Sequence, residues 1–143
     1  MKIYTIGFTK RTAEDFFTTL ASSGAKRLVD VRLNNSSQLA AFSKRDDLRY
    51  FLKAICGMEY VHLPELAPTQ ELLDEFRRGK DWDAYARMFN QLMEERQVET
   101  ALAREVIDQG CLLCSEHAAE KCHRRLVAEY LGKKWDGAEI IHW

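Results

Sequence analysis

Short β-rich segments alternate with amphipathic helical segments along this chain. The first β-rich segment covers residues 2–8 (KIYTIGF), and the helical spacing of apolar residues after it ends near Gly24. Because parallel strands are joined by right-handed crossovers, such alternation is typical of a sheet with helices on both faces. The sequence therefore predicts an α/β fold, a single three-layer α/β/α domain over residues 1–143 with a mainly parallel sheet of about five strands. The other strands are expected over residues 27–32, 59–63, 111–114 and 138–142.

Capping residues mark the ends of the predicted helices. Thr12 and Asp15 form a variant capping box, and Ser43 with Asp46 offers a second N-cap. The second predicted helix ends at Gly57. Further helices are expected from Thr69 to Arg78 with Gly79 closing it, from Trp82 onward, from about Thr100 to Asp108 after a bend near residues 96–99, and from about residue 120 to 131.

Composition and charge narrow the class of protein. Hydrophobic residues make up 46% of the chain and charged residues 30%, which is ordinary for a globular domain. The formal net charge of −1 gives no global attraction for nucleic acid, which would need a local basic cluster to bind. No apolar stretch approaches the roughly 20 residues of a membrane span, and the opening MKIYTIGFTK does not resemble a signal peptide. A cytoplasmic location without a membrane partner is therefore expected.

The four cysteines differ in their expected roles. In a chain long enough to form its own core, reduced thiols are more expected than a disulfide scaffold. Cys56 at a helix end and Cys111 within a strand are predicted to be small core residues. Cys114 ends a strand and Cys122 opens a helix, so these two are the candidates for reactive thiols.

Charged residues stand at the end of the second predicted strand. Asp30 and Arg32 are two positions apart, so they face the same side of that strand. One interpretation is a structural ion pair that holds the loop after it. The other is that Arg32 binds an anionic ligand while Asp30 orients the guanidinium. In a parallel sheet the carboxyl ends of the strands share one edge, which is where ligands bind in open α/β folds.

Residues 114–124 place proton-transfer and anion-binding side chains beside the two candidate thiols. Glu116 follows Cys114, and His123 and Arg124 follow Cys122. A helix N-terminus and nearby arginines lower the pKa of a thiol and favour the thiolate. The sequence therefore suggests a catalytic set with a cysteine nucleophile and with Glu116 or His123 as the proton carrier.

Three other interpretations of these residues stay open. A Glu116–Arg124 ion pair over buried thiols would be purely structural, with His123 as a core histidine. A redox switch could use Cys114 and Cys122. A soft metal such as zinc could be bound by the two thiols and His123, with His117 as a further ligand. Because neighbours on a helix splay apart, Cys122 and His123 are poorly placed to share an ion, so no metal or other cofactor is expected.

The chain resembles the domain of unknown function 488 family over nearly its whole length. The opening TIGFTKRTAEDFFTTL is similar to the family's TIGHSNRS start and following helix, and VDVR matches its second strand. Phe42-Ser43 resembles the family's F(S/T), and YVHLPELA resembles Y.HLPELGG. CLLCSEHAAEKCHRRLVAEYL is similar to a signature of Cys-x-Glu followed by Cys-His-Arg. The resemblance implies these characteristic polar positions: Arg11, Asp30, Arg32, Cys114, Glu116, Cys122, His123 and Arg124.

The chain departs from the family pattern in two places. Phe8 stands where the family has a histidine, and Thr9-Lys10 replaces its Ser-Asn. The arginine of the PELGGR segment is missing, since Ala67-Pro68-Thr69 stands there. If the family's histidine takes part in its chemistry, that chemistry is altered in this chain. The resemblance supports a site at these residues and implies no particular reaction.

The sequence favours a thiol-dependent enzyme acting on a small anionic or nucleotide-like substrate at the carboxyl ends of the strands. Its candidate catalytic residues are Cys114, Glu116, Cys122 and His123, and its candidate substrate-binding residues are Arg11, Asp30, Arg32 and Arg124. The alternative is a non-catalytic module that binds nucleic acid or a protein partner. The basic candidates for that role are Lys44, Arg45, Arg49, Arg77, Arg78 and Lys80.

Overall fold

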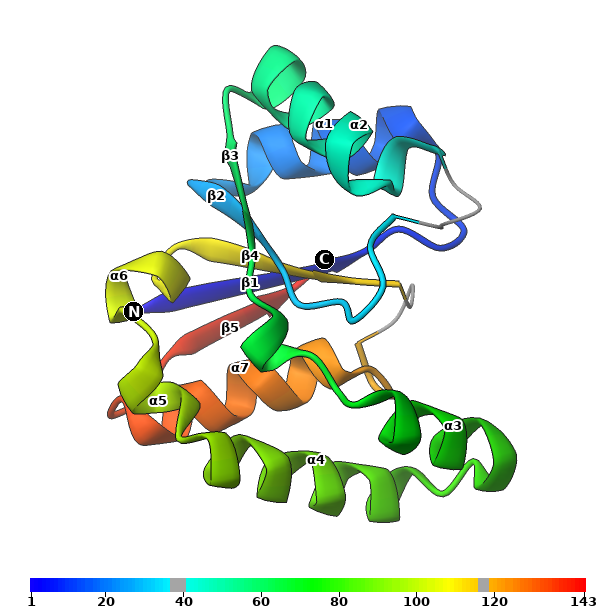
Figure 1. The fold of residues 1–143 in the computed structure, drawn as a ribbon. Coiled ribbons are helices and arrows are strands. Elements are labelled where there is room, and N and C mark those ends of the chain that lie inside the picture. The colour runs from blue at the N-terminus through cyan, green and yellow to red at the C-terminus, as the bar shows by residue number, and fades with distance from the viewer. Residues whose placement is uncertain (37–40, 116–118) are drawn as a thin grey trace.

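One parallel sheet runs through the centre of the computed structural model, which describes residues 1–36, 41–115 and 119–143 (Figure 1). Its five strands lie in the order β3-β2-β4-β1-β5, and every neighbouring pair is parallel. The predicted α/β fold is confirmed, and the predicted strand bounds differ from the observed ones by at most two residues. The strands are β1 Lys2–Gly7, β2 Arg27–Asp30, β3 Glu59–His62, β4 Gly110–Cys114 and β5 Glu139–His142.

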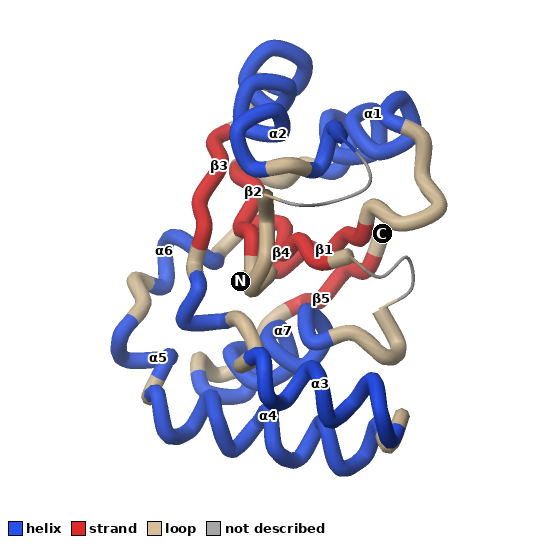
Figure 2. The backbone as a smooth tube through the Cα atoms, turned by 45° about the vertical axis from the view of Figure 1, so that its right-hand side comes forward, coloured by secondary structure: helices blue, strands red, loops and turns tan. Residues whose placement is uncertain are grey.

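Helices cover both faces of the sheet, as Figures 1 and 2 show. On one face lie α1 (Ala13–Ser23) and α2 (Arg45–Phe51), and on the other lie α4 (Trp82–Arg96) and α7 (His123–Lys134). Because successive strand residues point to opposite faces, each strand contributes to two cores. Tyr4, Ile6 and Leu113 pack with Phe16, Phe17, Leu20, Leu48 and Leu52 in one core. Ile3 and Leu112 pack with Phe89, Met93, Leu126, Val127 and Leu131 in the other.

The first helix forms as its capping residues predict. The Thr12 side chain accepts a hydrogen bond from the backbone N–H of Asp15, and Gly24 ends the helix with a φ of 87°. The N-cap predicted at Ser43 is wrong. Ser43 closes a short 3₁₀ turn, Ala41–Ser43, and α2 begins after Lys44, which makes no side-chain cap. After α2 the chain continues as a π-helical turn, Leu52–Cys56, which ends at Gly57, as predicted.

The second half of the chain contains more helices than the periodicity predicts. α3 (Gln70–Gly79) packs beside α4, and the left-handed residue Gln97 gives the predicted bend after α4. The single helix predicted from Thr100 to Asp108 is wrong. Two one-turn helices, α5 (Val98–Ala101) and α6 (Arg104–Ile107), stand there because Leu102 and Ala103 are extended. Among the described residues, no helix has the length and apolar character needed to span a membrane.

The pairing register brings the carboxyl ends of the central strands together. Gly7 of β1 is opposite Cys114 of β4, and Asp30 of β2 is opposite Leu113. Beyond the ladder, the N–H of Val31 still donates to the carbonyl of Leu113 at 3.2 Å. The segments after β2 and β4 therefore leave the sheet side by side, next to the start of α7.

Candidate functional site

A pocket of about 410 Å³ lies where the segments after β2 and β4 meet the N-terminus of α7. Its walls come from these segments, from α3 and from the first turn of α4. Three of its described lining residues are cations, and none is a carboxylate. The lining residues are Arg32, Leu33, Asn34, Pro68, Leu73, Phe76, Arg77, Trp82, Tyr85, Cys114, Ser115, Lys121, Cys122 and His123.

Arg32 and Asp30 form a buried, two-point ion pair at one wall. Nε of Arg32 donates to Oδ1 of Asp30 at 2.8 Å, and Nη2 donates to Oδ2 at 2.9 Å. The two side chains are in contact, although β2 ends at Asp30 and Arg32 lies beyond the strand. The hydroxyl of Tyr60 also donates to Oδ2 of Asp30, at 2.6 Å. Burial, together with the Asp30 carboxylate, raises the pKa of Tyr60 well above its usual value.

One donor of this arrangement remains unused. Nη1 of Arg32 is buried and has no hydrogen-bond partner among the residues that the structure describes. The guanidinium carbon lies 5.5 Å from the ring centroid of Phe8, in cation–π contact. Phe8, which replaces the histidine of the family pattern, is therefore a buried platform for Arg32 and brings no titratable group to this position.

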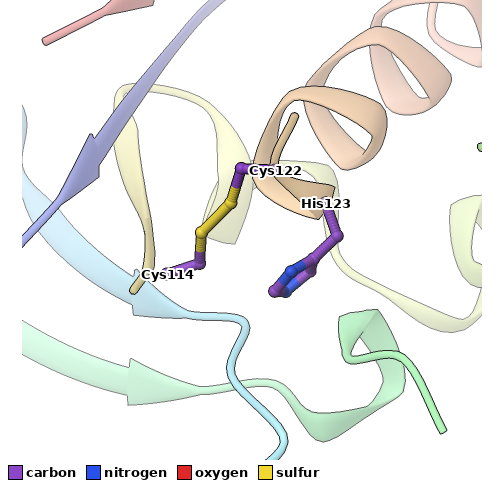
Figure 3. Close-up of side chains that lie close together, drawn as sticks. All are labelled: Cys114, Cys122 and His123. Atoms are coloured by element: carbon purple, nitrogen blue, oxygen red, sulfur yellow. A yellow bond between two sulfur atoms is a disulfide. The ribbon is translucent and has the colours of Figure 1, made fainter. Parts of the chain in front are cut away.

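Cys114 and Cys122 are joined by a disulfide in this structure, as Figure 3 shows. The expectation that the cysteines are reduced thiols is thus wrong for this pair, whereas Cys56 and Cys111 are free. A redox pair of Cys114 and Cys122 was one of the open interpretations, but the sequence could not give the distance between them, because it depends on how the end of β4 packs against the start of α7. Both bonded residues are almost fully buried and line the pocket. Cys111 is a core residue, as predicted, and Cys56 is half-buried.

His123 opens α7 with its ring held against the end of β2. Its Nε2 lies 2.7 Å from the carbonyl oxygen of Val31. A carbonyl oxygen can only accept, so Nε2 carries the proton and Nδ1 keeps its lone pair. Burial lowers the pKa of His123 to about 4, aided by the charge of Arg124. The neutral ring packs 5.7 Å, centroid to centroid, from Phe89 and lines the pocket.

The prediction that Cys122 and His123 splay apart is wrong. Cys122 is the N-cap of α7 and has an extended backbone, with φ −135° and ψ 140°, so the two residues are not consecutive helical positions. One ring nitrogen of His123 and the sulfurs of Cys114 and Cys122 all lie within 4.8 Å of one another. The sequence predicts that the last helix begins near residue 120, but α7 begins at His123, about one helical turn later. This difference places Cys122 at the N-cap instead of inside the helix.

Two further candidates, Arg124 and Arg11, are not among the described residues that line the pocket. Arg124 is fully buried, and it donates from Nε to the Thr5 hydroxyl at 3.2 Å and from Nη1 towards Cys114 Sγ at 3.6 Å. Arg11 pairs with Asp15 of α1 at 2.8 Å. Glu116, predicted as a proton carrier, and His117, a predicted metal ligand, lie outside the described residues.

Sequence reasoning missed the aromatic wall of the pocket. Phe76, Trp82 and Tyr85 lie at the junction of α3 and α4, with ring centroids 4.9 to 5.8 Å apart. Their spacing within the helices predicts core residues, and they do pack on the core. That the same rings also line the pocket of the candidate cysteines depends on contacts between distant segments, which periodicity does not reveal.

Comparison with known proteins places the chain in one family. No curated protein and no solved structure gives a significant match. The family model described as "Domain of unknown function DUF488" matches residues 12–131, which is most of the chain and includes Asp30, Arg32, Cys114, Cys122, His123 and Arg124. The chain therefore belongs to the family Domain of unknown function DUF488.

Proposed function

We propose that this protein is a thiol-dependent enzyme in which Cys114 and Cys122 exchange a disulfide with a small anionic substrate. One observation carries the proposal: the bonded cysteines line the same pocket as Arg32, Arg77 and Lys121, with no carboxylate among the described lining residues. Cations concentrated at a concave site favour an anionic ligand. The pocket volume of about 410 Å³ suits a small molecule.

Arg32 is the residue proposed to fix the substrate anion. Asp30 holds its Nε and Nη2, so the guanidinium plane is already oriented. We propose that Nη1, which is buried and has no partner among the described residues, donates to a carboxylate or phosphate of the substrate. A pre-oriented arginine loses little side-chain entropy when it binds a ligand. The structural and ligand-binding interpretations of Asp30 and Arg32 are thus compatible, because Nε and Nη2 bind Asp30 and Nη1 is the atom proposed to bind the ligand.

The proposed reaction is a balanced two-electron exchange. In the reduced protein, the Cys114 thiolate attacks one sulfur of a substrate disulfide, and the first substrate thiolate leaves. The Cys122 thiolate then attacks Cys114 Sγ, which releases the second substrate thiolate and forms the Cys114–Cys122 bond seen in Figure 3. The two protons of the protein thiols end on the two released thiols. The substrate is reduced, and the cysteine pair is oxidised.

Neighbouring groups support the two sulfurs in these roles. Arg124 donates towards Cys114 Sγ at 3.6 Å, which favours a thiolate there, and Cys122 lies at the N-terminus of α7. Nδ1 of the neutral His123 ring keeps its lone pair and can accept a hydrogen bond from a thiol. We also propose the cytoplasm as the compartment, because the thiol reductants present there would return the pair to its reduced form.

Turnover of two aromatic disulfides tests the proposal, one bearing carboxylates and one neutral but of similar size. With a dithiol reductant that returns the Cys114–Cys122 pair to thiols after each cycle, and with the uncatalysed reaction subtracted, the wild-type protein is expected to reduce the carboxylate-bearing compound with the higher kcat/KM. Arg32→Gln is expected to raise KM for that compound by roughly tenfold or more, with little change for the neutral one. Comparing the two substrates within one variant separates anion binding from any loss of folded protein.

Three further variants complete this experiment. Arg78→Gln, which removes an exposed cation of α3 that is not among the pocket-lining residues, should leave both KM values unchanged. Cys122→Ser should trap a mixed disulfide on Cys114, visible by intact mass. Equal kcat/KM for the two compounds, or full activity of Cys114→Ser, would show that the proposal is wrong.

A further inference from the structure

When their disulfide is reduced, Cys114 and Cys122 offer two thiolates beside the imidazole of His123, which is a set of ligands found in metal sites. We propose that, when the Cys114–Cys122 bond is reduced, the two thiolates and His123 bind one zinc ion. Two sulfurs and one imidazole nitrogen within 4.8 Å of one another are a Cys₂His donor set. Such sets favour zinc over hard cations, and three protein ligands with an open fourth position are typical of catalytic zinc sites. This inference goes beyond the proposed exchange reaction and uses the same pair in its reduced state.

The hydrogen bond of His123 suits a metal ligand. Metal-binding histidines nearly always donate their other ring N–H to a carboxylate or a backbone carbonyl, which fixes the tautomer and the ring orientation. In this structure the acceptor is the carbonyl of Val31, 2.7 Å from Nε2. Nδ1 is therefore the nitrogen with a free lone pair, and the ring is held in place before any ion arrives.

The backbone also allows the two sulfurs to separate around an ion. In a tetrahedral site with Zn–S bonds of about 2.3 Å, the sulfurs stand roughly 3.8 Å apart. The Cα atoms of Cys114 and Cys122 are 7.5 Å apart, and the residues belong to different elements, the end of β4 and the N-cap of α7. Rotation of the two side chains after reduction can therefore open the space for the ion without moving the sheet.

The change between the two states is balanced. A dithiol reductant supplies two electrons and two protons, is itself oxidised to a disulfide, and converts the Cys114–Cys122 bond into two thiols. Zinc then displaces the two thiol protons, since only thiolates bind the ion. Because all three ligands line the pocket, the fourth position opens onto it, where water or an anionic substrate held by Arg32 would bind. Zinc-bound thiolates cannot attack a disulfide freely, so the ion would also suppress the exchange reaction.

Titration of the full-length protein with Zn²⁺, in competition with a chromophoric chelator, tests the site. The reduced protein is expected to bind one equivalent, and the oxidised protein is expected not to compete. Co²⁺ reports the donor set, because thiolate ligation gives charge-transfer absorption in the near ultraviolet and a tetrahedral site gives intense d–d bands in the visible. His123→Gln should weaken Zn²⁺ binding by more than about tenfold, since losing only an outer-shell partner already costs roughly 10–100-fold.

Control variants keep the outcome clear. Cys56→Ser removes a free thiol outside the pocket and should bind Zn²⁺ like the wild type. Cys114→Ser and Cys122→Ser each remove one of the two thiolates, so each should weaken the thiolate-to-cobalt charge-transfer absorption. Circular dichroism should confirm that both variants are folded. The inference is overturned if reduced wild type binds Zn²⁺ no more tightly than the Cys114→Ser/Cys122→Ser double variant. Disulfide turnover measured in the presence of a chelator reports the exchange reaction separately, so either idea can fail alone.

Discussion

The guanidinium of Arg32 is held by Asp30 through two hydrogen bonds of 2.8 and 2.9 Å, and both side chains are almost completely buried. Removing one partner of a buried pair leaves an uncompensated charge, which costs more than the pair itself contributes. Asp30→Asn is therefore expected to lower the free energy of unfolding by about 3–5 kcal/mol, measured by urea denaturation.

Two variants check the cause of that loss. Asp46→Asn breaks an exposed ion pair with Arg45 and should change the free energy of unfolding by at most about 1 kcal/mol. The double variant Asp30→Leu/Arg32→Met removes both buried charges and should recover most of the stability. If Asp30→Asn unfolds at the wild-type urea concentration, the pair does not hold the loop after β2.

The hydroxyl of Tyr60 completes the shell around the same carboxylate. It donates to Oδ2 of Asp30 at 2.6 Å and accepts from Nδ2 of Asn35 at 3.2 Å. Because a hydrogen bond to a charged group contributes roughly 1.5–3 kcal/mol, Tyr60→Phe should lower the free energy of unfolding by about that amount. Tyr50→Phe, at a tyrosine that is 68% exposed, is the matched control and should stay within about 0.5 kcal/mol of the wild type.

Burial of His123 predicts a loss of stability in mild acid. Its pKa is about 4 in the folded protein and about 6.5 in the unfolded chain. Between these values the unfolded chain binds the proton more strongly, so stability is complete above about pH 6.5 and falls as the pH decreases towards 4. Urea midpoints of the oxidised protein, measured from pH 7.5 to about 5, should fall accordingly.

His123→Gln should remove much of this slope. Part of it should remain, because burial also lowers the pKa of His142, whose Nδ1 lies 2.6 Å from the Thr5 hydroxyl. A slope that is identical in the wild type and in His123→Gln would mean that the imidazole is solvated in the folded protein.

The parts of the fold that depend on local pattern could be predicted from the sequence. The strands are short apolar runs between helical segments, and the first helix has its capping residues at Thr12 and Gly24. The Asp30–Arg32 contact was expected from the two-residue period of a strand, although Arg32 lies just beyond the end of β2. The single helix predicted from Thr100 to Asp108 is wrong because two extended residues, Leu102 and Ala103, interrupt it. Tertiary packing overrides helix propensity at these two positions.

Four of the candidate residues named from the sequence, Arg32, Cys114, Cys122 and His123, line one pocket, but the sequence could not give their geometry. The sequence placed Cys114 and Cys122 near one another but gave no distance, and it took Cys122 to be a helical residue. The extended backbone of the N-cap turns the Cys122 side chain towards β4 and leaves His123 at the first helical position. The aromatic wall of α3 and α4 arises from contacts between distant segments, so no local pattern could reveal it.

The proposed chemistry requires at least one thiolate that forms more readily than in free cysteine. Rates of alkylation of the reduced protein against pH, resolved by site with mass spectrometry, measure this for all four thiols at once. Cys114 or Cys122 should react with an apparent pKa below the roughly 8.5 of free cysteine, while buried Cys111, whose thiol pKa burial raises, should react slowest. Arg124→Met, shown to be folded by circular dichroism, should raise the apparent pKa of Cys114. If Cys114 and Cys122 are both no more reactive than free cysteine at neutral pH, the two residues are packing elements and the proposed exchange reaction is contradicted.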